Sequence, residues 1–200
     1  MILPRFYPVL PDAVWVKKAV RCGARLVQLR FKGALAEVPD QIGTAQAACA
    51  RFGAQLVVND HWQAALSSGA NFVHLGQEDL DSADLPALAR AGVRLGISSH
   101  DRAELARALA LNPAYVALGP IYPTTLKVMK WQSQGLERLA LWRQLAGNIP
   151  LVAIGGLTLS RLPGVFAAGA DSAAVVTDLI TAADPEARIK DWLAACEVAP

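Results

Sequence analysis

Eight short apolar segments alternate with longer segments of helical pattern along the whole chain. Several of them have centres that are apolar without alternation, for example residues 56–58 and 173–176. Continuous apolar runs are typical of strands buried on both faces, as in a parallel sheet covered by helices. We therefore predict strands over residues 6–10, 25–30, 55–60, 71–76, 94–99, 115–121, 151–156 and 172–178.

Helix signals occupy the segments between these strands. Pro11 and Asp12 form a helix-start signal, and Gly53 and Gly69 follow helical segments. Glycine ends helices because it adopts the left-handed conformation without a Cβ clash. We predict helices over residues 11–21, 37–52, 61–68, 83–91, 101–111, 136–146, 158–168 and 185–196.

Eight strands, each followed by a helix, predict an α/β fold, a single (β/α)8 TIM barrel over residues 1–200. The alternative is a doubly wound open sheet. No G-x-G-x-x-G follows the first predicted strand, which disfavours the dinucleotide-binding form of that fold.

Composition excludes several classes of protein. Hydrophobic residues make up 54% of the chain and charged residues 18%, which disfavours disorder. The formal net charge is +2, and the basic residues are scattered, so we expect no nucleic-acid partner. The three cysteines form no metal-ligand motif and fit a reducing compartment. The chain shows no signal peptide and no long apolar run, so we expect no membrane partner and a cytoplasmic location.

Basic and polar residues gather where strand two is predicted to end. Gln28, Arg30 and Lys32 alternate, and on an extended strand they would face the same side. Arginine offers a planar fork to phosphate oxygens and lysine a compact charge, so this face suits a phosphorylated ligand. The alternative is that Arg30 pairs with a neighbouring carboxylate for structural reasons alone.

Two carboxylates, Asp60 and Asp79, follow consecutive predicted strands. Active sites of such barrels lie at the carboxyl ends of the strands, so we expect the two side chains to lie side by side. Magnesium commonly uses one or two carboxylates and takes its other oxygens from phosphate and water. The alternative is that both residues cap the helices that follow.

The last two strand ends carry small residues. Gly155 and Gly156 follow strand seven, and Val176 and Thr177 lie at the end of strand eight. Backbone N–H groups of these loops form the phosphate site of many barrels, although two glycines can also simply make a tight turn. His74 lies within strand four, where a hydrogen-bonding role is more common than that of a base.

Taken in order, these residues resemble the thiamine phosphate synthase family over nearly the whole chain. Each motif is weak alone, and six at matching strand ends are specific. The motifs that carry the resemblance are residues 28–32 (QLRFK), 58–60 (VND), 73–79 (VHLGQED), 95–98 (LGIS), 119–124 (GPIYPT) and 153–156 (AIGG).

The resemblance implies an enzyme, a transferase that joins hydroxymethylpyrimidine diphosphate to hydroxyethylthiazole phosphate and releases pyrophosphate. It implies Mg²⁺ as cofactor and small-molecule substrates, and a homo-oligomer stays open as the assembly. Catalytic roles in stabilising the departing pyrophosphate fall on Arg30, Lys32, Lys127 and Ser98. Carried over by motif, the metal ligands are Asp60 and Asp79, and the other substrate-binding residues are Gln28 for the pyrimidine, Asn59 for the diphosphate, and Thr124, Gly156, Val176 and Thr177 for the thiazole phosphate.

One position departs from the family pattern. The family usually has Thr-x-Thr-Lys in the loop after strand six, whereas here Leu126 takes the place of the second threonine before Lys127. The loop over residues 126–135 either closes over substrate or packs on the barrel rim. Two other functions stay open: a related thiazole tautomerase, and a non-catalytic relative that binds a thiamine precursor. The intact polar set favours the synthase.

Overall fold

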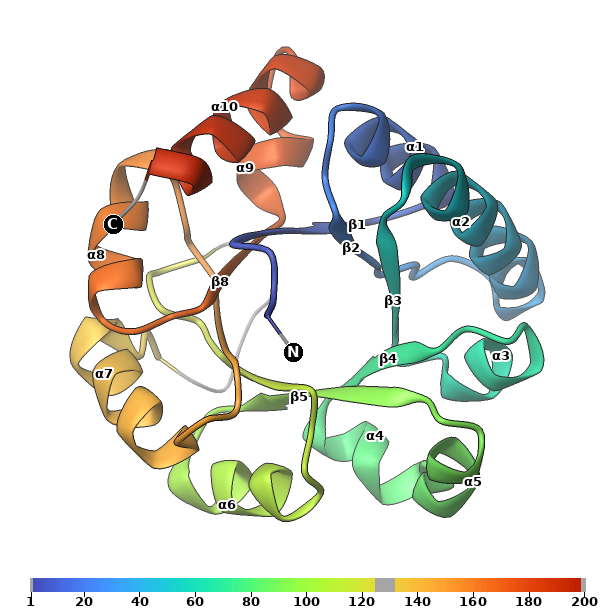
Figure 1. Cartoon of the computed structure of the whole chain (residues 1–200), viewed down its shortest axis with the longest axis horizontal. Helices are drawn as coiled ribbons and strands as arrows, with labels where there is room; N and C mark the ends of the chain where they lie inside the picture. The colour runs from blue at the N-terminus through green and yellow to red at the C-terminus, as the bar shows by residue number, and fades with distance from the viewer. Residues whose placement is uncertain (1, 125–131, 199–200) are drawn as a thin grey trace.

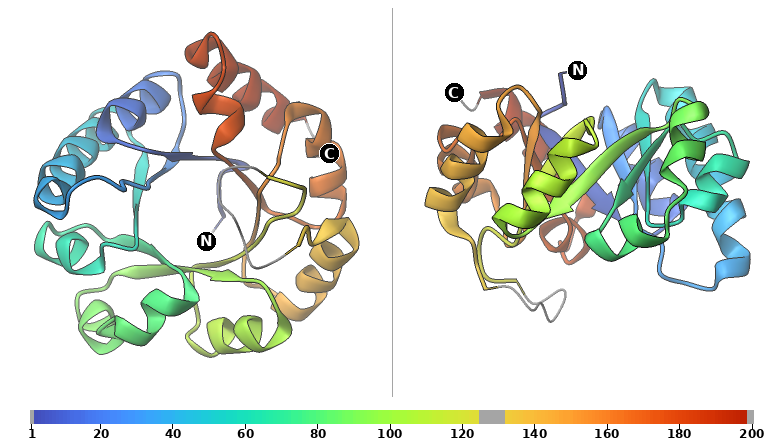
Figure 2. Two further views of the ribbon diagram at one scale, coloured as in Figure 1. Left: turned by 180° about the vertical axis from the view of Figure 1, so that it is seen from behind. Right: turned by 90° about the horizontal axis from the view of Figure 1, so that it is seen from below.

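The strands form one closed parallel barrel in the order β1 to β8, so the predicted (β/α)8 fold is confirmed. The computed structural model describes residues 2–124 and 132–198. Figure 1 shows the strands as an inner ring surrounded by helices, and Figure 2 shows the same ring from behind and from below. The strands are β1 (Phe6–Leu10), β2 (Leu26–Leu29), β3 (Gln55–Asn59), β4 (Phe72–Leu75), β5 (Arg94–Ser99), β6 (Tyr115–Leu118), β7 (Leu151–Ile154) and β8 (Ser172–Val175).

Helices follow every strand. The α-helices of the described residues are α1 (Ala13–Arg21), α2 (Val38–Phe52), α3 (Trp62–Ser67), α4 (Gln77–Ser82), α5 (Leu85–Arg90), α6 (Arg102–Ala110), α7 (Gly135–Ala146), α8 (Leu162–Ala167), α9 (Thr177–Ile180) and α10 (Pro185–Val198). Short 3₁₀ turns, Leu35–Glu37 and Leu159–Arg161, precede α2 and α8. The Asp12 side chain accepts a hydrogen bond from the Trp15 N–H at 2.9 Å, which confirms the predicted start of α1.

Two short helices at the strand ends were not predicted. Residues after β4 form α4, and the predicted last strand stops at Val175, because Thr177 and Asp178 begin α9. Only Val176 separates β8 from α9, so no glycine or proline marks that change, whereas Gly76 lies between β4 and α4 and the strand pattern was extended to include it. Both helices are also too short for helical periodicity to develop.

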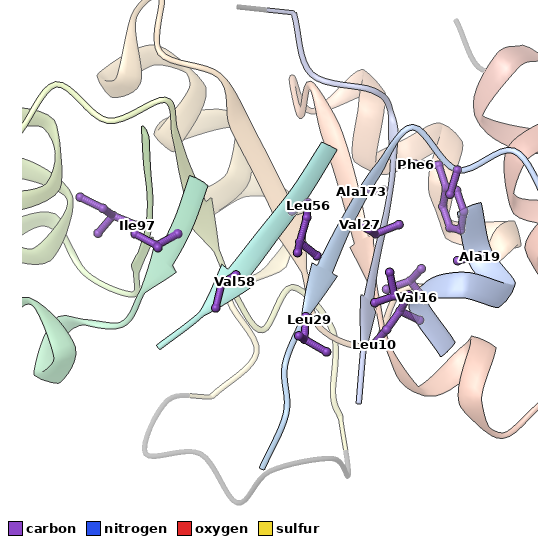
Figure 3. Packing of buried hydrophobic residues seen from close by; sticks show 14 of the residues in the cluster. Phe6, Leu10, Val16, Ala19, Val27, Leu29, Leu56, Val58, Ile97 and Ala173 are labelled. Atoms are coloured by element: carbon purple, nitrogen blue, oxygen red, sulfur yellow. The ribbon is translucent and has the colours of Figure 1, made fainter. Parts of the chain in front are cut away.

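Two layers of apolar side chains stabilise the barrel. The outer layer lies between strands and helices, and Figure 3 shows part of it, with Val16 and Ala19 of α1 near Phe6 and Leu10 of β1. The inner layer fills the barrel lumen, as is usual in this fold. It consists of Leu3, Tyr7, Val9, Leu26, Val57, Phe72, Tyr115, Ala117, Val152 and Ala174.

These side chains fill the lumen, and the active sites of such barrels lie beyond it, at the carboxyl ends of the strands. Side chains of β5 show the alternation: Ile97 belongs to the outer layer, and Ser99 accepts a hydrogen bond from the Trp142 indole of α7 at 2.9 Å. Gly96 and Ser98 lie on the opposite, lumen side of that strand. Among the described residues, no helix has both the length and the apolar character needed to cross a membrane.

Candidate active site at the barrel mouth

Asp60 follows β3 directly and adopts an unusual backbone conformation. Its φ is 61°, in the left-handed region that few residues other than glycine and asparagine or aspartate adopt. The turn is held by the Asp60 N–H, which donates to the His74 carbonyl of β4 at 2.9 Å. Strained conformations of this kind cost about 1–3 kcal/mol and concentrate at functional sites. The turn fixes the Asp60 carboxylate at the mouth.

Lys32 and Asp60 form an ion pair there. The Lys32 Nζ lies 2.5 Å from Asp60 Oδ2, and the two side chains are 51% and 25% exposed. The lysine comes from the loop after β2 and the aspartate from the end of β3, so neighbouring strands bring them together. A pair this exposed adds little stability, which leaves both groups available to a ligand.

Asp79 lies beside Asp60. The sequence had suggested that Asp79 lies at a strand end, and the structure does not place it there. It occupies the first turn of α4, and its Oδ2 accepts from the Gly76 N–H at 3.1 Å. The capping interpretation is therefore correct for Asp79. The residue nevertheless interacts directly with the Asp60 carboxyl group, so the predicted juxtaposition of the two carboxylates is confirmed.

The two carboxyl groups have opposite pKa shifts. Burial raises the pKa of Asp79, and the neighbouring Asp60 charge raises it further. Burial also opposes ionisation of Asp60, but the hydrogen bond and charge of Lys32 outweigh it and lower the pKa of Asp60. Like charges this close disfavour joint ionisation, and a cation bound between them would reverse that preference.

This donor set fits Mg²⁺. The described residues contain no group of three or more histidine, cysteine, aspartate or glutamate side chains placed to hold a metal. Magnesium does not need one, because two carboxylates together with phosphate oxygens and water complete its octahedron. The pair Asp60 and Asp79 would provide the protein part of such a site.

Gln28 lies in β2, whereas Arg30 and Lys32 follow it, and the three alternating residues do not all reach the mouth. Gln28 is only 4% exposed, and its amide donates to the Tyr7 hydroxyl at 2.9 Å inside the barrel. Arg30 is partly exposed just above it, and Asn59, the last residue of β3, is buried. The predicted polar face thus runs from the lumen outward, with Gln28 innermost and Lys32 at the rim.

His74 lies in the lumen and is hydrogen-bonded on both ring nitrogens. Its Nδ1 lies 2.8 Å from the Tyr115 hydroxyl and its Nε2 2.8 Å from Ser98 Oγ. Burial lowers the pKa of His74 from its ordinary value of 6.5 to about 4, and this outweighs the opposing charge of Asp60. The ring is therefore neutral at pH 7, and the hydrogen-bonding interpretation of His74 is correct.

Gly155 and Gly156 are required by close packing. Both have positive φ values, 96° and 64°. A Cβ on Gly155 would lie 2.6 Å from the Pro120 Cα, and one on Gly156 would lie 2.5 Å from the Pro123 carbonyl. The loop after β6 therefore approaches these glycines directly, and the tight-turn interpretation is correct. A phosphate role for the same backbone is compatible with it.

The remaining predicted residues lie around this side of the mouth or outside the described structure. Thr124 is partly exposed and ends the described first part of the loop after β6, which we call loop six. Val176 and Thr177 begin α9. Lys127 and Leu126 lie outside the described residues, as does part of the predicted lid over 126–135. Gln134, at the far end of that loop, donates from its backbone to the Pro120 carbonyl at 2.7 Å.

Sequence reasoning missed three residues that shape the site. Tyr7 and Tyr115 extend the polar contacts of Gln28 and His74 into the lumen, and the Gln77 amide donates to the Ser98 carbonyl at 2.7 Å. The tyrosines could have been found from their spacing. Tyr7 lies two positions before Val9 and Tyr115 two positions before Ala117, so each tyrosine faces the lumen with that neighbour. A hydroxyl at such a position requires a polar partner when buried.

The fold and these residues define a class: a (β/α)8-barrel enzyme whose carboxylates, lysine and hydroxyl meet at the carboxyl ends of the strands. A family model described as thiamine monophosphate synthase matches residues 9–179. The chain belongs to the thiamine monophosphate synthase family.

Individual proteins agree with this assignment. The chain is 55% identical to a thiamine-phosphate synthase of Rhizobium etli, covering 98% of this chain and 96% of that protein. It is 48% identical to a thiamine-phosphate synthase of Neisseria meningitidis serogroup A, covering 95% and 93%. A solved thiamine phosphate pyrophosphorylase from Pyrococcus furiosus superposes with a TM-score of 0.84 at 25% identity, covering 97% and 96% of the two chains.

Proposed function

We propose that this protein is a transferase that makes thiamine phosphate. It joins the methylene carbon of hydroxymethylpyrimidine diphosphate to the ring nitrogen of hydroxyethylthiazole phosphate, and the C–O bond to the diphosphate breaks as pyrophosphate leaves. The observation that carries the proposal is the cluster of Lys32, Asp60 and Asp79 at the mouth. Such a cluster suits a diphosphate and its metal ion.

The leaving group gains negative charge as the bond breaks, and fixed positive charges stabilise that transition state more than the ground state. Lys32, Arg30 and Lys127 supply these charges in our proposal, and Asn59 and Ser98 supply hydrogen bonds. Lys32 is already held at the mouth by Asp60. No protein nucleophile is needed, because the thiazole nitrogen forms the new bond.

Mg²⁺, held by Asp60 and Asp79, would neutralise part of the diphosphate charge when bound. Asp79 is the carboxylate whose protonation competes with metal binding, since its pKa is raised. Asp60 stays ionised to lower pH because of Lys32. The protein thereby keeps one carboxylate charged before any cation arrives.

The thiazole phosphate is assigned to the opposite side of the mouth, at Thr124, Gly156, Val176 and Thr177. Support comes from the two positive-φ glycines after β7 and from the start of α9 after β8, where backbone N–H groups are not used by helical hydrogen bonds. Gln28 lies deepest and is assigned to the pyrimidine end of the site.

A coupling assay tests the proposal. With both substrates and Mg²⁺, the protein should form thiamine phosphate and pyrophosphate in equal amounts, and omission of the thiazole phosphate should abolish thiamine phosphate. Isomerisation of a thiazole substrate without pyrophosphate release would instead identify a tautomerase. Binding without turnover would identify a non-catalytic relative. Either result overturns the proposal.

The setting of the enzyme is part of the same proposal. We expect a cytoplasmic protein with small-molecule partners, one domain over residues 1–200, no nucleic-acid or membrane partner, and a homo-oligomer as one possible assembly. Sedimentation analysis of the purified chain measures the assembly directly.

A further inference from the structure

A chain of four hydrogen bonds crosses the barrel lumen and ends at the mouth. Gln28 Nε2 donates to the Tyr7 hydroxyl at 2.9 Å, and that hydroxyl lies 2.8 Å from the Tyr115 hydroxyl. Tyr115 lies 2.8 Å from His74 Nδ1, and His74 Nε2 lies 2.8 Å from Ser98 Oγ. Five strands contribute one residue each, and we call this set the interior chain.

The interior chain has one direction that satisfies every member. The Tyr7 hydroxyl accepts from Gln28, so its own proton is free for Tyr115. The Tyr115 proton then goes to His74 Nδ1, and the buried neutral imidazole carries its single proton on Nε2. In this direction that proton is donated to Ser98 Oγ, which lies 2.8 Å from Nε2. The Ser98 hydroxyl proton is then the only one that has no acceptor within the interior chain.

We propose that the interior chain turns Ser98 into a hydrogen-bond donor aimed at the departing diphosphate, and that Tyr115 and His74 are positioning residues for it. This inference rests on the proposed function. The opposite direction would have Ser98 donate to His74 and present only a lone pair to the site, which disfavours an anion. Linked donors polarise one another, so the last hydroxyl becomes a better donor than an isolated serine.

The lumen is built to hold the chain in place. A Cβ on Gly96 of β5 would lie 2.4 Å from the Tyr115 hydroxyl oxygen, so only glycine at this position leaves room for that group. The Tyr115 ring stacks on His74 with centroids 5.5 Å apart and meets Phe72 at 5.8 Å. At the mouth, Gln77 fixes the Ser98 backbone. Ser98 itself is partly exposed, as a group that meets substrate must be.

A double-mutant cycle between Tyr115→Phe and Ser98→Ala tests the proposal by steady-state kinetics of thiamine phosphate formation. In the wild-type background, Tyr115→Phe should lower kcat about tenfold and change the KM for the pyrimidine diphosphate by less than about threefold. In the Ser98→Ala background, the same change should alter kcat less than about twofold, because Tyr115 acts only through Ser98. Equal fold losses in both backgrounds overturn the proposal.

The matched control is Val152→Ala, a buried residue of the lumen that is not part of the interior chain. Its fold effect on kcat should be the same in both backgrounds, and loss of that effect in the Ser98→Ala background would assign the result to general damage and overturn the proposal.

Should Tyr115→Phe fail to fold, His74→Gln and His74→Leu replace it. Glutamine keeps an N–H for Ser98 and leucine does not, so only His74→Gln should stay within about threefold of wild-type kcat. Equal loss in both variants overturns the proposal.

The wild-type measurement separates this inference from the proposed function. A wild-type protein that makes no thiamine phosphate overturns both. A wild-type protein that couples its substrates, with additive losses in the cycle, overturns the interior chain alone.

Discussion

Single residues at the mouth carry energetically unfavourable arrangements that the rest of the barrel tolerates. Asp60 has a left-handed backbone, and its carboxylate interacts directly with that of Asp79. Neither arrangement stabilises the fold, since like charges repel and a positive φ is strained. In our proposal a cation bound between the two carboxylates would remove their repulsion. Both arrangements are typical of functional sites, which tolerate local strain.

Removing one of these charges should separate activity from stability. Asp60→Asn or Asp79→Asn should lower turnover at least about tenfold, equivalent to about 1.4 kcal/mol of transition-state stabilisation. The melting temperature should stay equal or rise, because the repulsion between the two groups is gone. Asp81→Asn is the control: Asp81 lies on α4 too, but it is exposed and pairs with Arg107 at 2.6 Å. Turnover of Asp81→Asn should match wild type, and full activity in the two mouth variants with Mg²⁺ chelated would refute the metal assignment.

His74 should make stability depend on pH. The folded protein holds it neutral down to about pH 4, whereas the unfolded chain binds a proton from about pH 6.5. Between these values the unfolded state binds more protons, so the free energy of unfolding should fall with decreasing pH, by up to about 3 kcal/mol. Urea unfolding of wild type and His74→Gln at pH 4.5 and pH 8 measures this. The loss should be smaller in His74→Gln, and identical losses would contradict the assignment.

Residue identities at the site could be predicted from sequence better than their directions. Asp60 and Lys32 were placed at the mouth because parallel strands end at one edge. Asp79 was assigned to a strand end, because the polar residues after Gly76 were taken as the end of the strand and not as the first turn of α4. Gln28 was expected at the mouth, whereas Tyr7 holds its amide inside the lumen. Such pairings depend on residues more than twenty positions apart.

At the scale of elements, glycines at the helix ends were predicted well because their role is local. Gly53 has φ 64° and ends α2. Strand lengths were overestimated where the apolar pattern continued into a turn, as after β6 and β7. Glycines that serve tertiary packing could not be predicted in this way, because the loop that packs against them comes from another part of the chain.

Two glycines of different role should respond oppositely to alanine. Gly155→Ala places a Cβ against Pro120 at a positive φ and should lower the free energy of unfolding by about 1–3 kcal/mol. Gly43→Ala, in the middle of α2, meets nothing within 4 Å and should raise it by about 0.5–1 kcal/mol. Chemical denaturation of both variants gives the comparison. A stabilised Gly155→Ala would show that β7 and loop six do not pack as described.

At the scale of the whole molecule, the barrel was predictable because eight similar strand–helix units repeat. Continuous apolar strands require cover on both faces, and a closed parallel sheet with a filled lumen provides it. Which polar residues enter the lumen could not be predicted, since the interior chain joins five strands through side chains alone. The register of the strands decides which of these residues meet. In the barrel, His74 pairs with Gly96, and Gly96 pairs with Tyr115.

The central claim is that the mouth binds a diphosphate with its metal ion, and a crystal structure with Mg²⁺ and pyrophosphate tests it most directly. We predict the metal between Asp60 and Asp79, and the pyrophosphate in contact with Lys32, Arg30 and Ser98. In that complex Lys32 should turn from Asp60 toward phosphate oxygens. Pyrophosphate bound only at Gly156 and Thr177, with no metal at the two aspartates, would contradict the account.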